Sequence, residues 1–171
     1  FISNRRGTAD VWKLAPGGAP VRLTTGGGDK AFVTASPDGR WIGFSLTSDQ
    51  DVHTVVMRPD GSDVHTLSPE ALGRFSFCGF WGWSPDGSRV ILTITSKEQP
   101  WATLLAAFDR DTGSIRDLVT LKLPGWGAGG FSWSPDGRFL VYEAVSDGSW
   151  DLWVADSEGK NPRRLTSDPG N

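Results

Sequence analysis

The sequence contains very little cysteine, methionine or tyrosine, and it lacks a long apolar run. Its 171 residues include 1 Cys, 1 Met and 1 Tyr. The single cysteine, Cys78, excludes an internal disulfide framework and a multi-cysteine metal site, but it indicates no redox compartment. Without a run of about 18 apolar residues or a charged segment leading into an apolar one, we expect neither a membrane-spanning helix nor a signal peptide.

Neither sign of charge dominates the chain. The 17 basic and 20 acidic residues are interspersed and give a net charge of −3. This pattern provides no cluster of positive charge that would bind a polyanion or a membrane surface. We therefore predict no nucleic-acid partner and no direct membrane insertion.

Turn-forming and aromatic residues are abundant. The chain has 22 Gly, 11 Pro, 9 Trp and 9 Phe, a composition typical of many short strands joined by tight turns around aromatic packing. The length corresponds to one domain or one repeat array. An all-β fold follows from this composition.

A repeat supports that prediction. Ser-Pro-Asp-Gly occurs at 36–39, 84–87 and 134–137, with periods of 48 and 50, which are typical of a four-stranded propeller blade. In each copy the proline presets φ for the first central turn position, and the glycine accepts a positive φ. The chain is therefore predicted to reverse at each copy.

Strands are predicted on both sides of each reversal. Before it lie short runs with small residues, read as inner strands near a crowded central channel: 31–33, 80–83 and 130–133. After it the sequence alternates, so one face of each second strand is predicted to be buried. The residues on that face are Ile42, Phe44 and Leu46, then Val90, Leu92 and Ile94, then Leu140, Tyr142 and Ala144.

Four sequence features in combination resemble the TolB-type, WD-like propeller repeat. Ser-Pro-Asp-Gly-Arg is followed by an aliphatic strand, then by Asp-Leu-Trp-Val at 151–154, and then by Gly-Lys-Asn-Pro-Arg-Arg-Leu-Thr at 159–166. The resemblance covers nearly the whole chain, and it implies blades of four antiparallel strands, usually six or more in number. Here Phe1 aligns with Phe44, so one inner strand is missing.

We therefore predict a β-propeller of four-stranded antiparallel blades, present as an open arc of three complete blades and one incomplete blade. The last five residues are polar and contain a proline, so they are not expected to supply the missing strand. We expect the arc to come from a longer chain whose remaining blades cover its open ends, or to self-associate through those ends. The predicted blades are 1–28 (incomplete), 30–70, 78–121 and 129–168.

Candidate binding residues lie in the longer connections at one end of the blades, because binding is concentrated on such loops. Aromatic and positively charged residues there are suited to anchoring a protein or peptide partner. Aromatic residues at blade junctions equally serve to pack neighbouring sheets together. The candidates are Arg5, Arg6, Phe75, Lys97, Trp101, Trp126 and Trp150.

No catalytic, metal or cofactor motif is apparent in the sequence. Residues 130–134 have Ser in place of the last Gly of a nucleophile elbow, and His53 and His65 have no recognisable nucleophile nearby. Asp109–Gly113 lacks the later ligands of a calcium loop. The glycine-rich stretches at 26–28 and 125–130 lack the lysine of a phosphate cradle. We predict no catalytic residues, no metal and no cofactor.

The resemblance implies a non-catalytic scaffold of bacterial type that binds a protein or peptide in the periplasm or outside the cell. Two alternatives stay open. One is the gating propeller of a larger hydrolase resembling the prolyl oligopeptidase or tricorn families. The other is the sensor propeller of a membrane-anchored kinase or transcription regulator. Sequence downstream or upstream of the chain would discriminate between them, because fold alone does not specify function.

Overall fold

The computed structural model describes residues 1–48, 51–67, 75–96, 102–109, 111–113, 115–121, 128–146 and 148–167. Within these ranges the regular structure consists of strands, which form one three-stranded sheet and three four-stranded sheets. In every sheet the strands follow one another in chain order. The predicted all-β fold of antiparallel four-stranded units is thus confirmed.

The strand bounds are as follows. The first sheet contains β1 (Ile2–Ser3), β2 (Asp10–Lys13) and β3 (Val21–Arg22). The second contains β4 (Asp29–Ala35), β5 (Ile42–Ser48), β6 (Asp51–Met57) and β7 (His65–Leu67). The third contains β8 (Phe75–Trp83), β9 (Arg89–Ser96), β10 (Ala102–Phe108) and β11 (Ile115–Leu121). The fourth contains β12 (Ala128–Trp133), β13 (Phe139–Ser146), β14 (Ser149–Asp156) and β15 (Arg163–Arg164).

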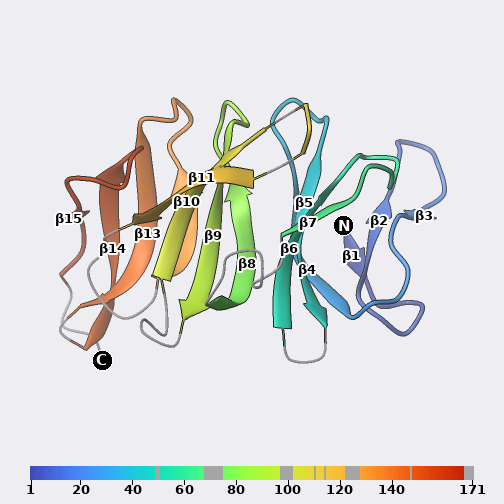
Figure 1. The fold of residues 1–171 in the computed structure, drawn as a ribbon, viewed down its shortest axis with the longest axis horizontal. Coiled ribbons are helices and arrows are strands. Elements are labelled where there is room, and N and C mark those ends of the chain that lie inside the picture. The colour runs from blue at the N-terminus through green and yellow to red at the C-terminus, as the bar shows by residue number, and fades with distance from the viewer. Residues whose placement is uncertain are drawn as a thin grey trace.

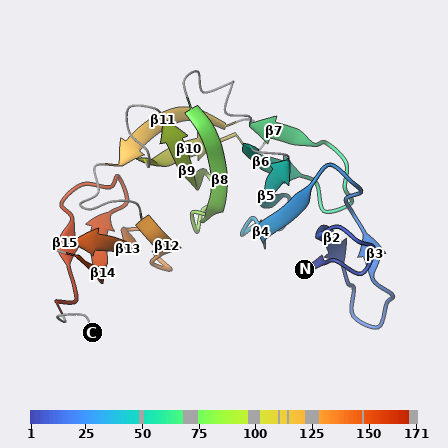
Figure 2. The ribbon, with the colours of Figure 1, turned by 90° about the horizontal axis from the view of Figure 1, so that it is seen from below.

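The four sheets stand side by side along the molecule (Figure 1). Seen from below, they form an open arc, with the first and fourth sheets at its two ends (Figure 2). Strands β4, β8 and β12 lie on the concave side, and β7, β11 and β15 lie on the convex side. The first strand of each four-stranded sheet therefore faces the space that the arc surrounds.

The Ser-Pro-Asp-Gly turns owe their shape to a repeated set of hydrogen bonds. Ser36 Oγ donates to Asp38 Oδ1 at 2.6 Å and accepts the Trp41 amide at 3.0 Å, which closes the turn between β4 and β5. The turns at Ser84 and Ser134 repeat both bonds. Gly39 completes the first turn at φ 68°, a value that L-residues rarely adopt. The same rigid connection thus joins the first two strands of each four-stranded sheet.

Aromatic packing holds the second and third sheets together. Trp41 is 0% exposed, and its ring meets Phe108 edge-on at 5.6 Å. Phe108 in turn meets Trp83 at 4.5 Å. Gly43 leaves room for Phe80, since a Cβ at Gly43 would lie 2.4 Å from the end of that ring. The core of the arc therefore lies between sheets, as expected for units that each bury their apolar side against a neighbour.

The predicted buried face of the second strands is confirmed where the side chains are described. Leu140, Tyr142 and Ala144 are at most 1% exposed, Val90, Leu92 and Phe44 are also buried, and Ile42 and Leu46 are partly buried. Ile94 lies outside the described side chains. In the two middle sheets the opposite face is buried as well, because each of these sheets packs against neighbours on both sides. Ser45 is 3% exposed and Ile91 is 1% exposed on that second face.

A buried carboxylate ties the first sheet to β4. Asp10 is 0% exposed; it accepts hydrogen bonds from Thr24 at 2.9 Å and from Arg22, and it pairs with Lys30 at 3.0 Å. Burial alone would raise the pKa of Asp10, but the hydrogen bonds from Arg22 and Lys30 outweigh burial and hold that pKa well below its usual range. Asp151 occupies the corresponding place in the fourth sheet, where Arg164 and Thr166 bind it. The repeated use of this arrangement indicates a structural anchor.

Candidate binding site

The concave side of the arc is shaped by irregularities in the three inner strands. The pairing register shifts between Ala31 and Thr34 in β4, between Phe80 and Gly82 in β8, and between Ala128 and Phe131 in β12. Such bulges re-aim side chains and are common next to functional sites. Phe32, inside the first bulge, has φ 55°, although it is not a glycine. A bulky residue in that region is a genuine outlier and points to a local constraint.

These bulges place one aromatic residue from each inner strand in a continuous row. The ring centroids of Phe32 and Trp81 are 5.0 Å apart, and those of Trp81 and Phe131 are 6.0 Å apart. Phe131 also stacks on Tyr142 at 5.9 Å. Burial raises the pKa of Tyr142 to about 12, so its hydroxyl stays neutral at physiological pH. We call Phe32, Trp81 and Phe131 the aromatic row.

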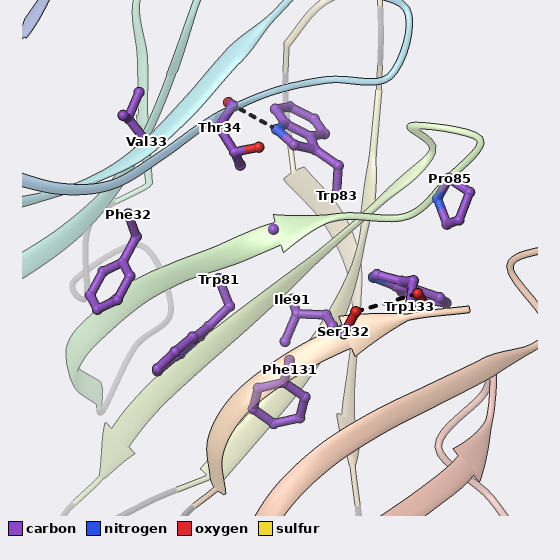
Figure 3. A pocket seen from close by; sticks show the side chains of 11 residues that line it. Phe32, Val33, Thr34, Trp81, Trp83, Pro85, Ile91, Phe131, Ser132 and Trp133 are labelled. Atoms are coloured by element: carbon purple, nitrogen blue, oxygen red, sulfur yellow. Dashed lines mark hydrogen bonds between the residues drawn. The ribbon is translucent and has the colours of Figure 1, made fainter. Parts of the chain in front are cut away.

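The aromatic row forms one wall of a pocket with a volume of about 450 Å³ (Figure 3). A ligand-sized cavity with mostly apolar walls and a few polar groups is the usual form of a binding site. None of its lining residues carries a charged side chain. The lining comprises Phe32, Val33, Thr34, Trp81, Gly82, Trp83, Pro85, Ile91, Phe131, Ser132 and Trp133.

Two tryptophans line the same pocket, but their indole N–H groups differ in their hydrogen bonding. Trp83 Nε1 donates to the Thr34 carbonyl at 3.3 Å, which links the second and third sheets (Figure 3). Trp133 occupies the same place before its turn, but its Nε1 is buried and has no hydrogen-bond partner among the described residues. A buried donor left without a partner costs about 1–3 kcal/mol. Trp133 therefore presents an unused donor to this region.

A second cavity of about 300 Å³ lies beside the Ser-Pro-Asp-Gly turns of the third and fourth sheets, and Trp133 lines both cavities. Three charged residues line the second cavity: Asp86, Arg89 and Asp136. Asp136 lies in it with a lowered pKa, because the Ser134 hydroxyl and then the Arg138 amide donate to its carboxylate. Arg89 also lines it and pairs with Glu158 at 2.6 Å. The lining of the larger cavity thus carries no charged side chain, whereas the lining of the smaller one does.

The residues proposed from the sequence are not gathered at these cavities. Arg5 and Arg6 are exposed in the first sheet, and Trp150, 61% exposed, belongs to β14 at the other end of the arc. Phe75 was placed in a link between blades, which is wrong, because it begins strand β8 and pairs with Ser96. Lys97, Trp101 and Trp126 lie outside the described residues.

The aromatic row itself was missed by sequence reasoning. Phe32 lies four residues before Ser36, whereas Trp81 and Phe131 lie three residues before Ser84 and Ser134. This near-constant position before the repeated turn was the available signal. It was hidden because aromatic residues inside strands are ordinarily packing residues.

No helix in the described part of the chain is long and apolar enough to cross a membrane. Nor does that part contain a group of three or more His, Cys, Asp or Glu residues placed to hold a metal ion.

Comparison with known proteins identifies relatives in sequence. No family model matches the chain. An uncharacterised protein of Agrobacterium fabrum is 30% identical over 130 residues, which cover 73% of this chain and 43% of that protein. The Tol-Pal system protein TolB of Anaeromyxobacter dehalogenans is 31% identical over 87 residues, or 51% of this chain and 18% of TolB. The chain thus spans less than half of the curated relatives it matches.

Solved structures share the fold. TolB from Acinetobacter baumannii superposes with a TM-score of 0.69 at 19% identity, covering 96% of this chain and 39% of that one. A putative TolB from Agrobacterium tumefaciens gives 0.69 at 20% identity, covering 92% and 55%. An oligogalacturonate lyase in complex with manganese gives 0.61 at 16% identity, covering 89% and 40%. At such identities these likenesses establish the fold alone.

Proposed function

Because this chain is built from TolB-like β-propeller repeats, we propose that it is a non-catalytic scaffold whose aromatic pocket binds an extended segment of a partner protein. The supporting observation is the aromatic row, which lines an uncharged cavity of about 450 Å³ on the concave side of the arc. Aromatic residues supply large, rigid contact areas and dominate the energetics of protein recognition.

An extended peptide fits the surroundings of the row. Strands β4, β8 and β12 are each the edge strand of their sheet and face the inside of the arc (Figure 2). Edge strands offer backbone N–H and C=O groups to an added chain, while neighbouring pockets select its side chains. Such a segment would satisfy the backbone groups of these edge strands.

The chemistry of the pocket favours binding over catalysis. Ser132 and Thr34 are the hydroxyl residues of its lining, which includes no histidine, lysine or carboxylate for proton transfer. Ser132 Oγ donates to the Trp133 carbonyl at 3.4 Å. A hydroxyl without an adjacent base is a weak nucleophile. The fold is shared with a lyase and with a periplasmic gluconolactonase, but the pocket suits recognition.

We further propose a periplasmic or extracellular location, in line with the resemblance to TolB.

The test begins with selection of peptides from a displayed library of random decapeptides on the whole 171-residue chain. The dissociation constant of a labelled selected peptide is then measured by fluorescence anisotropy. Phe32→Gly removes one exposed ring of the row without emptying the core, because Phe32 is 57% exposed. Loss of one aromatic contact of about 1.4 kcal/mol should weaken binding roughly tenfold.

Two further variants make the result decisive. Val64→Ala removes an apolar side chain that is 58% exposed outside the pocket, and it should leave the dissociation constant unchanged. Arg6→Ala tests the longer-loop end of the first sheet. If selection yields no binder, or if Arg6→Ala weakens binding while Phe32→Gly does not, the proposed function is wrong. Galacturonate oligomers in the same assay should compete for the peptide only if the site takes sugars instead.

A further inference from the structure

The second cavity lies where the packing between neighbouring sheets changes. Between the second and third sheets, Trp41 is fully buried and meets Phe108 edge-on at 5.6 Å. Arg89 takes the place of Trp41 in the next sheet, because each follows the serine of its turn by five residues. Ala155 takes the place of Phe108, since each immediately precedes the residue whose carbonyl accepts the amide of the hairpin glycine. A guanidinium and a methyl group thus replace two aromatic rings, which leaves room for the cavity of about 300 Å³.

The second cavity adjoins the larger one. Trp133 and Pro85 line both cavities (Figure 3). Phe131 of the aromatic row and Pro135 of the second cavity are four residues apart along the chain. An extended segment running beside β12 therefore spans both cavities with about four residues of its own. This makes the second cavity a further contact for the partner segment proposed above, so the inference rests on that proposed function.

Arg89 does not make the second cavity a site for anions. Its Nη1 lies 2.6 Å from Glu158 Oε1 and donates to the Ser157 carbonyl at 3.0 Å. Glu158 thus neutralises Arg89, and the guanidinium joins the third sheet to the hairpin turn of the fourth. An anionic group that entered the cavity would also meet the carboxylates of Asp86 and Asp136, which line it.

Asp136 provides an acceptor for a cation. Its pKa is lowered, chiefly by the hydrogen bond from the Ser134 hydroxyl, so the carboxylate is ionised at neutral pH. The Ser134 hydroxyl and the Arg138 amide both donate to Oδ1, and Oδ2 has no hydrogen-bond donor among the residues that the structure describes. Trp133 adds an aromatic wall, and an aromatic ring attracts a cation that lies over its face. A lysine or arginine side chain suits both groups, because its apolar stem can pack against the walls while its charge meets the carboxylate.

We propose that the partner segment carries a lysine or arginine within about four residues of its apolar anchor, and that this cationic side chain binds in the second cavity. The apolar anchor contacts the aromatic row, and the cation pairs with Asp136 Oδ2 beside Trp133. The larger cavity has no charged lining residue, so a charged side chain placed there would lose water without gaining a counter-charge. The two cavities therefore select an apolar residue and a basic residue at separate places.

The decapeptides selected on the whole chain give the first test. Lysine or arginine should be enriched within about four positions of the apolar residue, relative to the unselected library. The affinity of such a peptide should fall as salt is added, because exposed ion pairs are screened. Selected peptides without this basic residue, or with aspartate or glutamate enriched in its place, would overturn the proposal.

A comparison of protein variants with two peptides isolates the ion pair. Asp136→Asn keeps an oxygen that can accept both turn bonds but removes the charge. It should weaken binding of a selected lysine-containing peptide about threefold by fluorescence anisotropy, which is within the range for exposed ion pairs. The same peptide with glutamine in place of lysine should bind Asp136→Asn and the unaltered chain equally. Asp38→Asn is the matched control, because Asp38 makes the same bonds in the turn at Ser36 but lines neither cavity, and it should leave both affinities unchanged.

The outcomes separate the basic-residue site from the aromatic site. Suppose that Phe32→Gly weakens binding but Asp136→Asn has no effect, or weakens the lysine and glutamine peptides equally, or acts no more strongly than Asp38→Asn. The basic-residue site is then wrong, and the aromatic site stands. If no binder is selected, or if Phe32→Gly leaves binding unchanged, the proposed function fails and the basic-residue site fails with it.

Discussion

Phe32→Gly should be more stable than Phe32→Ala, which is the reverse of the order found at an ordinary strand position. In a strand interior, glycine is less stable than alanine by about 0.5–1 kcal/mol, because it loses more freedom on folding. Phe32 has φ 55°, a conformation that costs an L-residue about 1–2 kcal/mol. Glycine removes that strain and alanine keeps it, so Phe32→Gly should be the more stable variant by about 0.5–1 kcal/mol.

Both variants lose the contact between the Phe32 and Trp81 rings, which is worth about 0.5–1.5 kcal/mol. Relative to the unaltered chain, we therefore expect Phe32→Gly to be nearly neutral and Phe32→Ala to be destabilised by about 0.5–1 kcal/mol. Urea unfolding followed by tryptophan fluorescence measures both. With a slope of about 2 kcal/mol/M, the two midpoints should differ by roughly 0.3–0.5 M.

The control variants are Thr47→Gly and Thr47→Ala. Thr47 is an exposed residue of β5 and is not among the residues with positive φ. There the ordinary order should hold, with glycine below alanine by about 0.5–1 kcal/mol. If Phe32→Ala equals or exceeds Phe32→Gly in stability while the Thr47 pair behaves normally, the bulge is not strained and the reasoning fails.

Four other changes follow from the inter-sheet contacts and buried charges. Trp41→Ala empties the fully buried site between the second and third sheets and should lower the free energy of unfolding by about 3–5 kcal/mol, measured by urea unfolding. Gly113→Ala should destabilise the chain by more than about 1 kcal/mol, because φ is 69° and the added Cβ would meet Trp41, a loss visible as a lower Tm. Asp10→Asn leaves Lys30 buried without its counter-charge and should cost roughly 3–5 kcal/mol in the same assay. Because the pKa of Asp10 is lower in the folded state than in the unfolded state, ionised Asp10 stabilises the fold fully above its ordinary pKa of about 4, and this stabilisation is lost as pH falls below that value. The urea midpoint of the unaltered chain should therefore decrease from pH 7 to pH 3. The decrease should be smaller in Asp10→Asn, which has no carboxylate to titrate at this position.

Much of the fold could be predicted because its signals are local. The turns at Ser36, Ser84 and Ser134 are specified by proline and glycine chemistry within four residues, and the alternation at Leu140, Tyr142 and Ala144 directly reports burial. The start of β8 was harder to predict. Phe75 lies in a strand because its backbone pairs with that of Ser96, a residue distant in sequence.

The candidate site could not be predicted in the same way. Phe32, Trp81 and Phe131 come together because each inner strand contains a bulge, and a bulge breaks the two-residue period that sequence reading relies on. The sequence directed attention instead to aromatic and charged residues near loops. Of those described, Arg5 and Trp150 lie at opposite ends of the arc.

Amide hydrogen exchange of the whole chain, with and without a selected decapeptide, tests the binding account most directly. Amide exchange in β4, β8 and β12 should slow when the peptide is bound, and exchange in β7 and β15 should stay unchanged. Protection confined to the segment around Arg5 and Arg6 or to the start of β14 at Trp150, with the three inner strands unaffected, would contradict it.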